Sequence, residues 1–122
     1  MLKVLFIIPA HESNECLVDT LDNIIKFNPD IEPYFVLYIS DMFHDFDERI
    51  VDKYQRILIT RKLRNHYGIK FESQIESLIK AYRLARDAFN DFDYVSIFHT
   101  SQLFTKTGYA DYIKNYDFSY DE

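Results

Sequence analysis

The chain opens with an apolar segment that changes abruptly into a polar one. Residues 4–8 form a continuous apolar run without alternation, which is typical of a strand covered on both faces in a parallel sheet. The residues Pro9-Ala10-His11-Glu12-Ser13-Asn14 end that run. Because open α/β sheets bind ligands at the carboxyl ends of their strands, we expect a small-ligand site in this polar segment.

The spacing of apolar residues and the turn signals predict seven further elements. In chain order they are a helix over 14–27, a strand over 34–39, a short helix over 47–54, a strand over 56–60, a helix over 70–89, a strand over 94–98 and a helix over 107–116. The first helix has Ser13 or Asn14 as its N-cap and ends at Asn28-Pro29-Asp30. Charged residues flank the third strand, which favours a place at an edge of the sheet.

Each predicted helix has one apolar side that faces the sheet. The inward residues of the four helices in turn are Leu17, Leu21, Ile24 and Ile25; Ile50, Val51 and Tyr54; Phe71, Ile75, Leu78, Ile79, Tyr82, Ala85 and Phe89; and Tyr109, Tyr112, Ile113 and Tyr116. The helix over 70–89 is the longest, at about 30 Å. Charged residues occupy its other side.

Strands that alternate with helices imply right-handed crossovers and a parallel sheet. If the long helix crosses back over the sheet, the strand order becomes 3-2-1-4. The loops after the first and fourth strands then share one crevice at the topological switch point. We therefore predict an α/β fold, a Rossmann-like three-layer αβα arrangement with a mainly parallel sheet, in a single domain over 1–122.

Composition narrows the class of protein. The chain has 122 residues, 48% of them hydrophobic, which suits one domain with a real core. Fourteen basic and twenty acidic residues give a formal charge of −6, which argues against a nucleic-acid or anionic-membrane surface. The opening apolar run is too short for a transmembrane segment and has the wrong flanks for a signal peptide. We expect a soluble, cytoplasmic chain.

One basic cluster interrupts this acidic sequence. It covers Arg61-Lys62-Leu63-Arg64-Asn65-His66-Tyr67-Gly68 and leads directly into the long helix. Two interpretations stay open: the cluster holds a ligand phosphate beside the free N–H groups of the helix start, or it is a solvated turn. With only two glycines, the chain has neither a G-x-G-x-x-G dinucleotide loop nor a P-loop.

Metal binding is a less favoured chemistry. The residues His11, His44 and His99 each follow a predicted strand, but their spacing matches no compact ligand motif. We therefore assign no metal and no cofactor, and a divalent metal stays the less favoured alternative.

Two Asp-x-Asp strings and one cysteine have simpler structural explanations. In the string 45–47, Asp45 with Glu48 three residues on is interpreted as a helix cap. The string 91–93 precedes its strand and is interpreted as turn chemistry. The only cysteine, Cys16, excludes an intrachain disulfide and is interpreted as a small core residue rather than a reactive thiol.

The opening strand with Pro9-Ala10-His11-Glu12-Ser13-Asn14-Glu15 resembles the start of GT-A-type glycosyltransferases, in which a Pro-Ala-x-Asn-Glu-like loop lies beside the nucleotide. The later sequence is similar to bacterial relatives of the core-2/I-branching glycosyltransferases. It has a basic-aromatic-Gly turn from Arg64 to Gly68, a long helix, an Asp-Tyr strand from Asp93 and a Ser-bearing loop, and residues 106–113 continue the pattern. The resemblance covers nearly the whole chain.

This resemblance implies a glycosyltransferase of polysaccharide biosynthesis that takes a nucleotide-sugar, of the UDP type first of all, as donor and a glycan as acceptor. Many GT-A enzymes carry a metal-binding Asp-x-Asp where this chain has His99-Thr100-Ser101-Gln102, and the branching family is similarly metal-independent. We assign nucleotide binding to His11, Glu12, Asp41, Arg61, Arg64, Gly68, His99 and Ser101. No catalytic base can be assigned.

A GT-A domain is usually much longer than this chain, which corresponds to its nucleotide-binding half. A fragment, a split gene product and a non-catalytic remnant all stay open. We expect no sugar transfer by the chain alone, and either self-association into a homo-oligomer or a missing C-terminal partner segment.

A non-catalytic α/β binding or interaction domain is the main alternative function. A receiver-like signalling module is disfavoured, because the third strand ends in Thr60-Arg61-Lys62 and lacks the phosphoaccepting Asp of that class.

Overall fold

The structure, a computed structural model, describes residues 1–10, 13–40, 43–61, 70–89, 92–98, 104–105 and 107–114, with the side chains of 61, 70–77 and 114 left aside. Strands and helices alternate along the chain, as predicted. The elements are β1 (Leu2–Ala10), α1 (Asn14–Phe27), β2 (Ile31–Ile39), the 3₁₀ helix η1 (Glu48–Lys53), β3 (Ile57–Arg61), α2 (Lys70–Phe89), β4 (Tyr94–Ile97) and α3 (Tyr109–Lys114).

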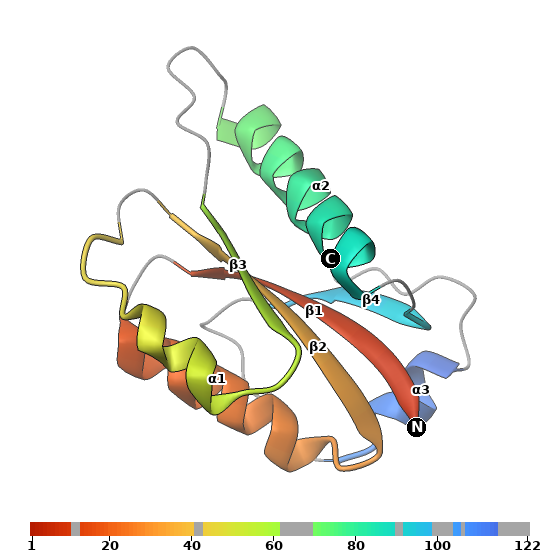
Figure 1. Ribbon diagram of the computed structural model, residues 1–122. Helices are drawn as coiled ribbons and strands as arrows, with labels where there is room; N and C mark the ends of the chain where they lie inside the picture. The colour runs from red at the N-terminus through yellow and green to blue at the C-terminus, as the bar shows by residue number, and fades with distance from the viewer. Residues whose placement is uncertain are drawn as a thin grey trace.

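The four strands form one parallel sheet in the order β3-β2-β1-β4 (Figure 1). β1 pairs with β2 along its whole length, and Val4–Ile7 also pairs with β4 on the other side. The crossover through α2 carries the chain from one edge of the sheet to the other. As a result, β4 pairs with β1 on the side opposite β2, and the topological switch point lies between β1 and β4. This confirms the predicted α/β Rossmann-like class and the order 3-2-1-4.

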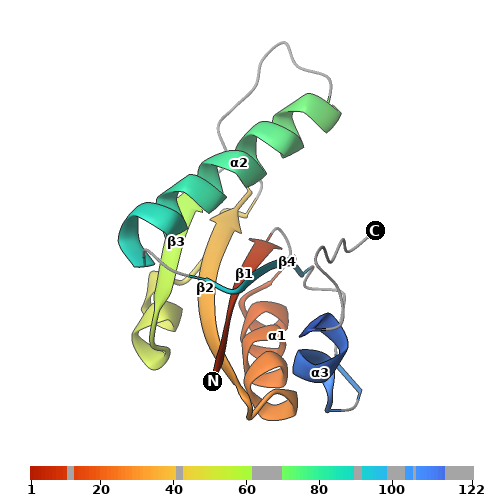
Figure 2. The same ribbon diagram turned by 90° about the vertical axis from the view of Figure 1, so that its right-hand side faces the viewer.

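The sheet lies between two helical layers (Figure 2). The side chains of β1 alternate between its two faces. Val4, Phe6 and Ile8 belong to a buried cluster with residues of α1, η1 and α3. Leu5 and Ile7 point to the opposite face, where they pack with Ala81 and Ala85 of α2. Because both faces are covered, the strand needs apolar residues at every position, which explains the unbroken run at 4–8.

β2 begins three residues earlier than the sequence predicts. Its first half contains Pro33, which lacks an N–H group and so argues against a central strand. At that level, however, β2 pairs only with β1, because its pairing with β3 begins at Phe35. Pro33 therefore lies where β2 is locally an edge strand, and its missing donor is tolerated.

The predicted inward faces are partly confirmed and partly wrong. Leu17, Leu21, Ile24, Ile50, Ala85 and Ile113 are buried, and Val51, Tyr54, Leu78, Tyr82, Phe89 and Tyr109 are half-buried. Ile25, Ile79 and Tyr112 were predicted inward but are 43%, 46% and 58% exposed. The predicted inward side chains of Phe71, Ile75 and Tyr116 lie outside the described ones.

Ile79 of α2 was predicted to face the sheet, and the packing of this helix explains why it does not. The helix places Ala81 and Ala85, one turn apart, against the sheet, and both are fully buried. Small side chains at this contact let the helix backbone approach the sheet closely, so the apolar stripe that meets it is narrow. Ile79 lies outside this stripe.

Candidate functional site

The candidate site is the edge of the sheet at which all four parallel strands end. β1 ends at Ala10, β2 at Ile39, β3 at Arg61 and β4 at Ile97. Of the predicted nucleotide-binding residues, Arg61 is described only as the last residue of β3. The others lie outside the described residues; they are His11, Glu12, Asp41, Arg64, Gly68, His99 and Ser101. The geometry of the site is therefore defined by the described residues that flank them.

The loops after β1 and β2 leave the sheet side by side. The Ser40 N–H donates to the Ala10 carbonyl oxygen at 2.9 Å, which continues the ladder one step beyond the strands. The Phe43 N–H then donates to the Ser40 carbonyl oxygen at 3.0 Å. The starts of the two loops are thus held together by a backbone hydrogen bond.

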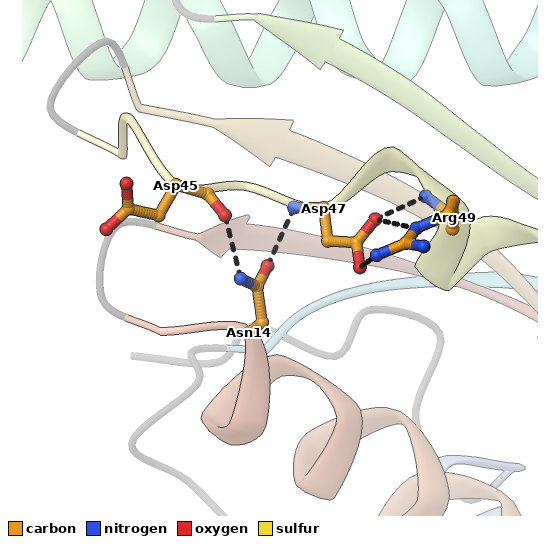
Figure 3. Close-up of polar contacts among 4 residues, drawn as sticks. All are labelled: Asn14, Asp45, Asp47 and Arg49. Carbon is orange, nitrogen blue, oxygen red and sulfur yellow. Dashed lines mark hydrogen bonds and ion pairs between the residues drawn. The ribbon is translucent and has the colours of Figure 1, made fainter.

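A side chain joins the same two loops a second time (Figure 3). Asn14, the first residue of α1, donates from Nδ2 to the Asp45 carbonyl oxygen at 2.8 Å. Its Oδ1 accepts from the Asp47 N–H at 2.9 Å. The half-buried amide therefore satisfies two backbone groups on the connection between β2 and η1.

The start of η1 is capped by an ion-paired carboxylate. Asp47 Oδ1 accepts from the Arg49 N–H and Nε, each at 3.0 Å, and Oδ2 accepts from Nη2 at 3.0 Å. These bonds lower the pKa of the Asp47 carboxyl and raise that of the Arg49 guanidinium.

The prediction that Asp45 caps this helix is wrong, because the helix begins at Glu48 and its N-cap is the residue before it, Asp47. In Figure 3 the exposed Asp45 carboxylate points away from Asn14 and Asp47, and only the Asp45 backbone contributes to the contact.

The connection after β4 is also anchored to α1. Asn23 Nδ2 donates to the Phe104 carbonyl oxygen at 3.0 Å, and the Phe104 N–H donates to Asn23 Oδ1 at 2.6 Å. The Phe104 ring stacks on Phe98 with centroids 5.0 Å apart and planes at 13°. The Phe98 N–H in turn donates to the Ile7 carbonyl oxygen at 2.9 Å. Both flanks of segment 99–103 are therefore fixed.

The other polar residues of interest have structural places. Asp93 exchanges two hydrogen bonds of 2.8 Å with the backbone of Lys3, at the amino end of the sheet. These bonds join β4 to β1 instead of closing a local turn, and Asp91 of the same string lies outside the described residues. Ser13 Oγ accepts from the Cys16 N–H at 3.1 Å, which confirms Ser13 as the N-cap of α1. Within the described part of the chain, no three His, Cys, Asp or Glu residues are placed to hold a metal ion.

Sequence reasoning named Asn14 only as an alternative N-cap and as part of the polar segment after the first strand, and it did not name Asn23. The only signal was a polar amide at each of two α1 positions, with Asn23 directly before the buried Ile24. Which backbone groups such an amide meets depends on the tertiary fold.

Comparisons with protein-family models, with curated proteins and with solved structures give no match. The glycosyltransferase resemblance therefore stays a hypothesis that rests on sequence motifs. None of the helices in the described ranges is both long enough and apolar enough to cross a membrane.

Proposed function

We propose that this domain binds a nucleotide or nucleotide-sugar at the carboxyl edge of its sheet. The observation that carries the proposal is the switch point between β1 and β4, next to which the loops after β1 and β2 are joined twice. In open parallel sheets such a point is where a ligand is bound by loops from neighbouring strands. The resemblance to GT-A glycosyltransferases favours a uridine diphosphate ligand.

The proposed contacts come from three places along this edge. His11, Glu12 and Asp41 belong to the loops after β1 and β2, and His99 and Ser101 belong to the loop after β4. The phosphates are assigned to Arg61, Arg64 and the turn at Gly68, because a chain with a formal charge of −6 needs a local basic cluster to hold an anion. A longer enzyme built around this domain would transfer the sugar to a glycan acceptor without a metal.

Calorimetric titration with a panel of nucleoside diphosphates tests the proposal. We expect uridine diphosphate to bind, with the same affinity whether a divalent metal or a chelator is present. Light scattering on the same samples reports whether the chain associates. If no nucleotide of the panel binds at millimolar concentration, the proposal is wrong and a non-catalytic interaction domain becomes the better hypothesis.

Two double variants test whether the basic cluster binds the phosphates of the nucleotide. The double variant Arg61→Ala, Arg64→Ala should weaken binding by about 1.5–3 kcal/mol, because each arginine is assigned a charge-assisted hydrogen bond. The control is Arg83→Ala, Arg86→Ala, which removes two exposed positive charges from α2 and changes the net charge equally. Equal losses in the two double variants would show that affinity follows net charge instead of a phosphate site.

A further inference from the structure

We infer that Asn14 is a positioning residue of the proposed nucleotide site, whose amide fixes the distance between the loops after β1 and β2. This inference rests on the proposed function. The two loops are joined at their starts by the Ser40 N–H and the Ala10 carbonyl oxygen, 2.9 Å apart. Asn14 joins them again beyond this point, at the backbone of Asp45 and Asp47.

The two junctions enclose short lengths of chain. On the first loop, three residues separate Ala10 from Asn14, and on the second, four residues separate Ser40 from Asp45. Ordering a backbone residue on binding costs conformational entropy, so a contact that already holds Asn14 against Asp45 and Asp47 reduces the part of this cost that the ligand must offset. Removing one junction should therefore weaken ligand binding even in a variant that keeps its fold.

The chemistry of the Asn14 contact requires an amide. A primary amide offers N–H donors and a carbonyl acceptor on one planar group, and here it meets one carbonyl oxygen and one N–H of the backbone. A carboxylate would still accept from the Asp47 N–H, but its second oxygen would face the Asp45 carbonyl oxygen without a proton between them. Alanine would lose both bonds.

A second contact between α1 and the same connection provides a matched control. The Tyr54 hydroxyl, just after η1, donates to Asp22 Oδ1 at 2.8 Å. In Figure 1 η1 lies beside α1, and the Asp22 contact is about two helical turns from Asn14. Tyr54→Phe therefore removes one hydrogen bond between the same two parts of the fold, away from the carboxyl edge of the sheet.

The test measures the Kd of uridine diphosphate for the full chain and for Asn14→Ala, Asn14→Asp and Tyr54→Phe, well below the lowest unfolding midpoint. At neutral pH both Asn14 variants should bind roughly tenfold more weakly than the wild type, and Tyr54→Phe should stay within about twofold. Asn14→Asp is expected to fold, since an acidic side chain in the first turn of a helix is favoured by the helix dipole.

A pH series separates positioning from a general loss of stability. A protonated carboxyl group has one O–H donor and one acceptor and can restore both bonds. The facing carbonyl oxygen disfavours the charged form of the introduced carboxyl, whereas the helix start and the Asp47 N–H favour it. As the pH falls from about 7.5 to about 4, near the ordinary pKa of an aspartate, the ratio of the Asn14→Asp Kd to the wild-type Kd should therefore fall towards one, whereas the Asn14→Ala ratio stays constant.

Each outcome is decisive. If the wild type binds uridine diphosphate and Asn14→Ala binds equally well, or if Asn14→Ala and Tyr54→Phe lose affinity alike, the inference is wrong and the proposed function stands. A constant Asn14→Asp ratio across the pH series also overturns it. If the wild type itself binds no nucleotide, the proposed function fails and the inference fails with it.

Discussion

Two asparagine side chains hold loops that the sheet alone would leave free. Asn14 meets the backbone at Asp45 and Asp47, and Asn23 meets both the N–H and the carbonyl of Phe104. In each contact the amide takes the place of a backbone group, with one donor and one acceptor satisfied. Both residues belong to α1, so one helix fixes the connections that follow β2 and β4.

The two carboxylates of the first Asp-x-Asp string should differ in their effect on stability. Asp47→Ala removes the cap of η1 and the pairing with Arg49 and should lower the urea midpoint of unfolding. Asp45→Ala removes an exposed carboxylate and should change the free energy of unfolding by less than about 0.5 kcal/mol. Equal effects of the two substitutions would contradict the assignment of the cap to Asp47.

The effect of Asp47 should also depend on pH. Hydrogen bonds from Arg49 lower the pKa of its carboxyl in the folded chain below the usual value of 3.8. A lowered folded pKa contributes stability that is present above the unfolded value and is lost as the pH falls through the folded one. The difference in urea midpoint between the wild type and Asp47→Ala should therefore narrow below about pH 3.8, and above that pH salt should reduce it, because salt screens the pairing with the exposed Arg49.

Arg56 holds a backbone conformation that L-amino acids other than asparagine and aspartate rarely adopt. Its φ is 52°, in the left-handed region. The side chain compensates, since Nε donates to the Pro33 carbonyl oxygen at 3.2 Å and the guanidinium lies 5.2 Å from the centre of the Tyr34 ring. At this residue the strained backbone lowers the stability of the fold, and the side-chain contacts raise it.

Two substitutions separate these effects. Arg56→Ala and Arg56→Gly both lose the side-chain contacts, but only glycine relieves the left-handed conformation. The glycine variant should therefore be more stable than the alanine variant by about 1 kcal/mol in urea unfolding. An alanine variant as stable as the glycine variant would show that the backbone is unstrained at this position.

At the scale of elements, the contact between η1 and α1 should be lost at high pH. Burial, followed by the hydrogen bond to Asp22, raises the pKa of the Tyr54 phenol above its usual value of 10.0. A raised folded pKa contributes stability that is fully present below the unfolded value and is lost as the pH rises towards the folded one. The wild type should therefore lose its advantage over Tyr54→Phe above about pH 10.

This prediction concerns the difference in urea midpoint between the two proteins, because the chain has nine further tyrosines that both proteins share. Urea unfolding of both proteins in a series of alkaline buffers measures it. A difference that stays constant from neutral pH to the alkaline limit would mean that Tyr54 titrates alike in the folded and unfolded chains.

Local sequence patterns predicted most elements, and their errors have tertiary causes. The helix over 70–89 was predicted with the observed bounds, because the spacing of its apolar residues is a local signal. The start of β2 was missed because the tolerance of Pro33 depends on where β3 begins to pair. Ile79 was placed inward because helical spacing does not reveal that Ala81 and Ala85 make the contact with the sheet. The roles of Asn14 and Asn23 depend on loops that only the complete fold brings near them.

At the scale of the whole molecule, topology could be predicted better than chemistry. The handedness of βαβ crossovers leaves few strand orders, and the order 3-2-1-4 was among them. The same rule places the loops after β1 and β4 at one edge. It does not specify which atoms in those loops contact a ligand, and that part of the candidate site stays a prediction.

The sheet should open from its edges. β1 and β2 are central strands of nine residues each, and Val4–Ile8 is almost completely buried. β3 and β4 have five and four residues and lie at the edges, and most of their described side chains are half-buried. In native-state hydrogen exchange, amides of β1 and β2 should exchange only through global unfolding, whereas those of β4 should exchange through a smaller opening with a lower free energy.

Ligand binding extends this prediction to the switch point. A ligand held only by the loops after β1 and β2 stays bound when β4 opens, so the protection of β4 amides would not change. A ligand that also contacts the loop after β4 must leave first, and at a hundred times its Kd it should raise the free energy of that opening by about 2.7 kcal/mol. We expect the second result with uridine diphosphate, measured on the Phe98 amide, which follows β4 and donates to the Ile7 carbonyl oxygen, against the buried Phe6 amide as the internal reference. Unchanged protection at Phe98, together with measurable binding, would place the ligand away from the switch point and on the β1–β2 side that Asn14 holds together.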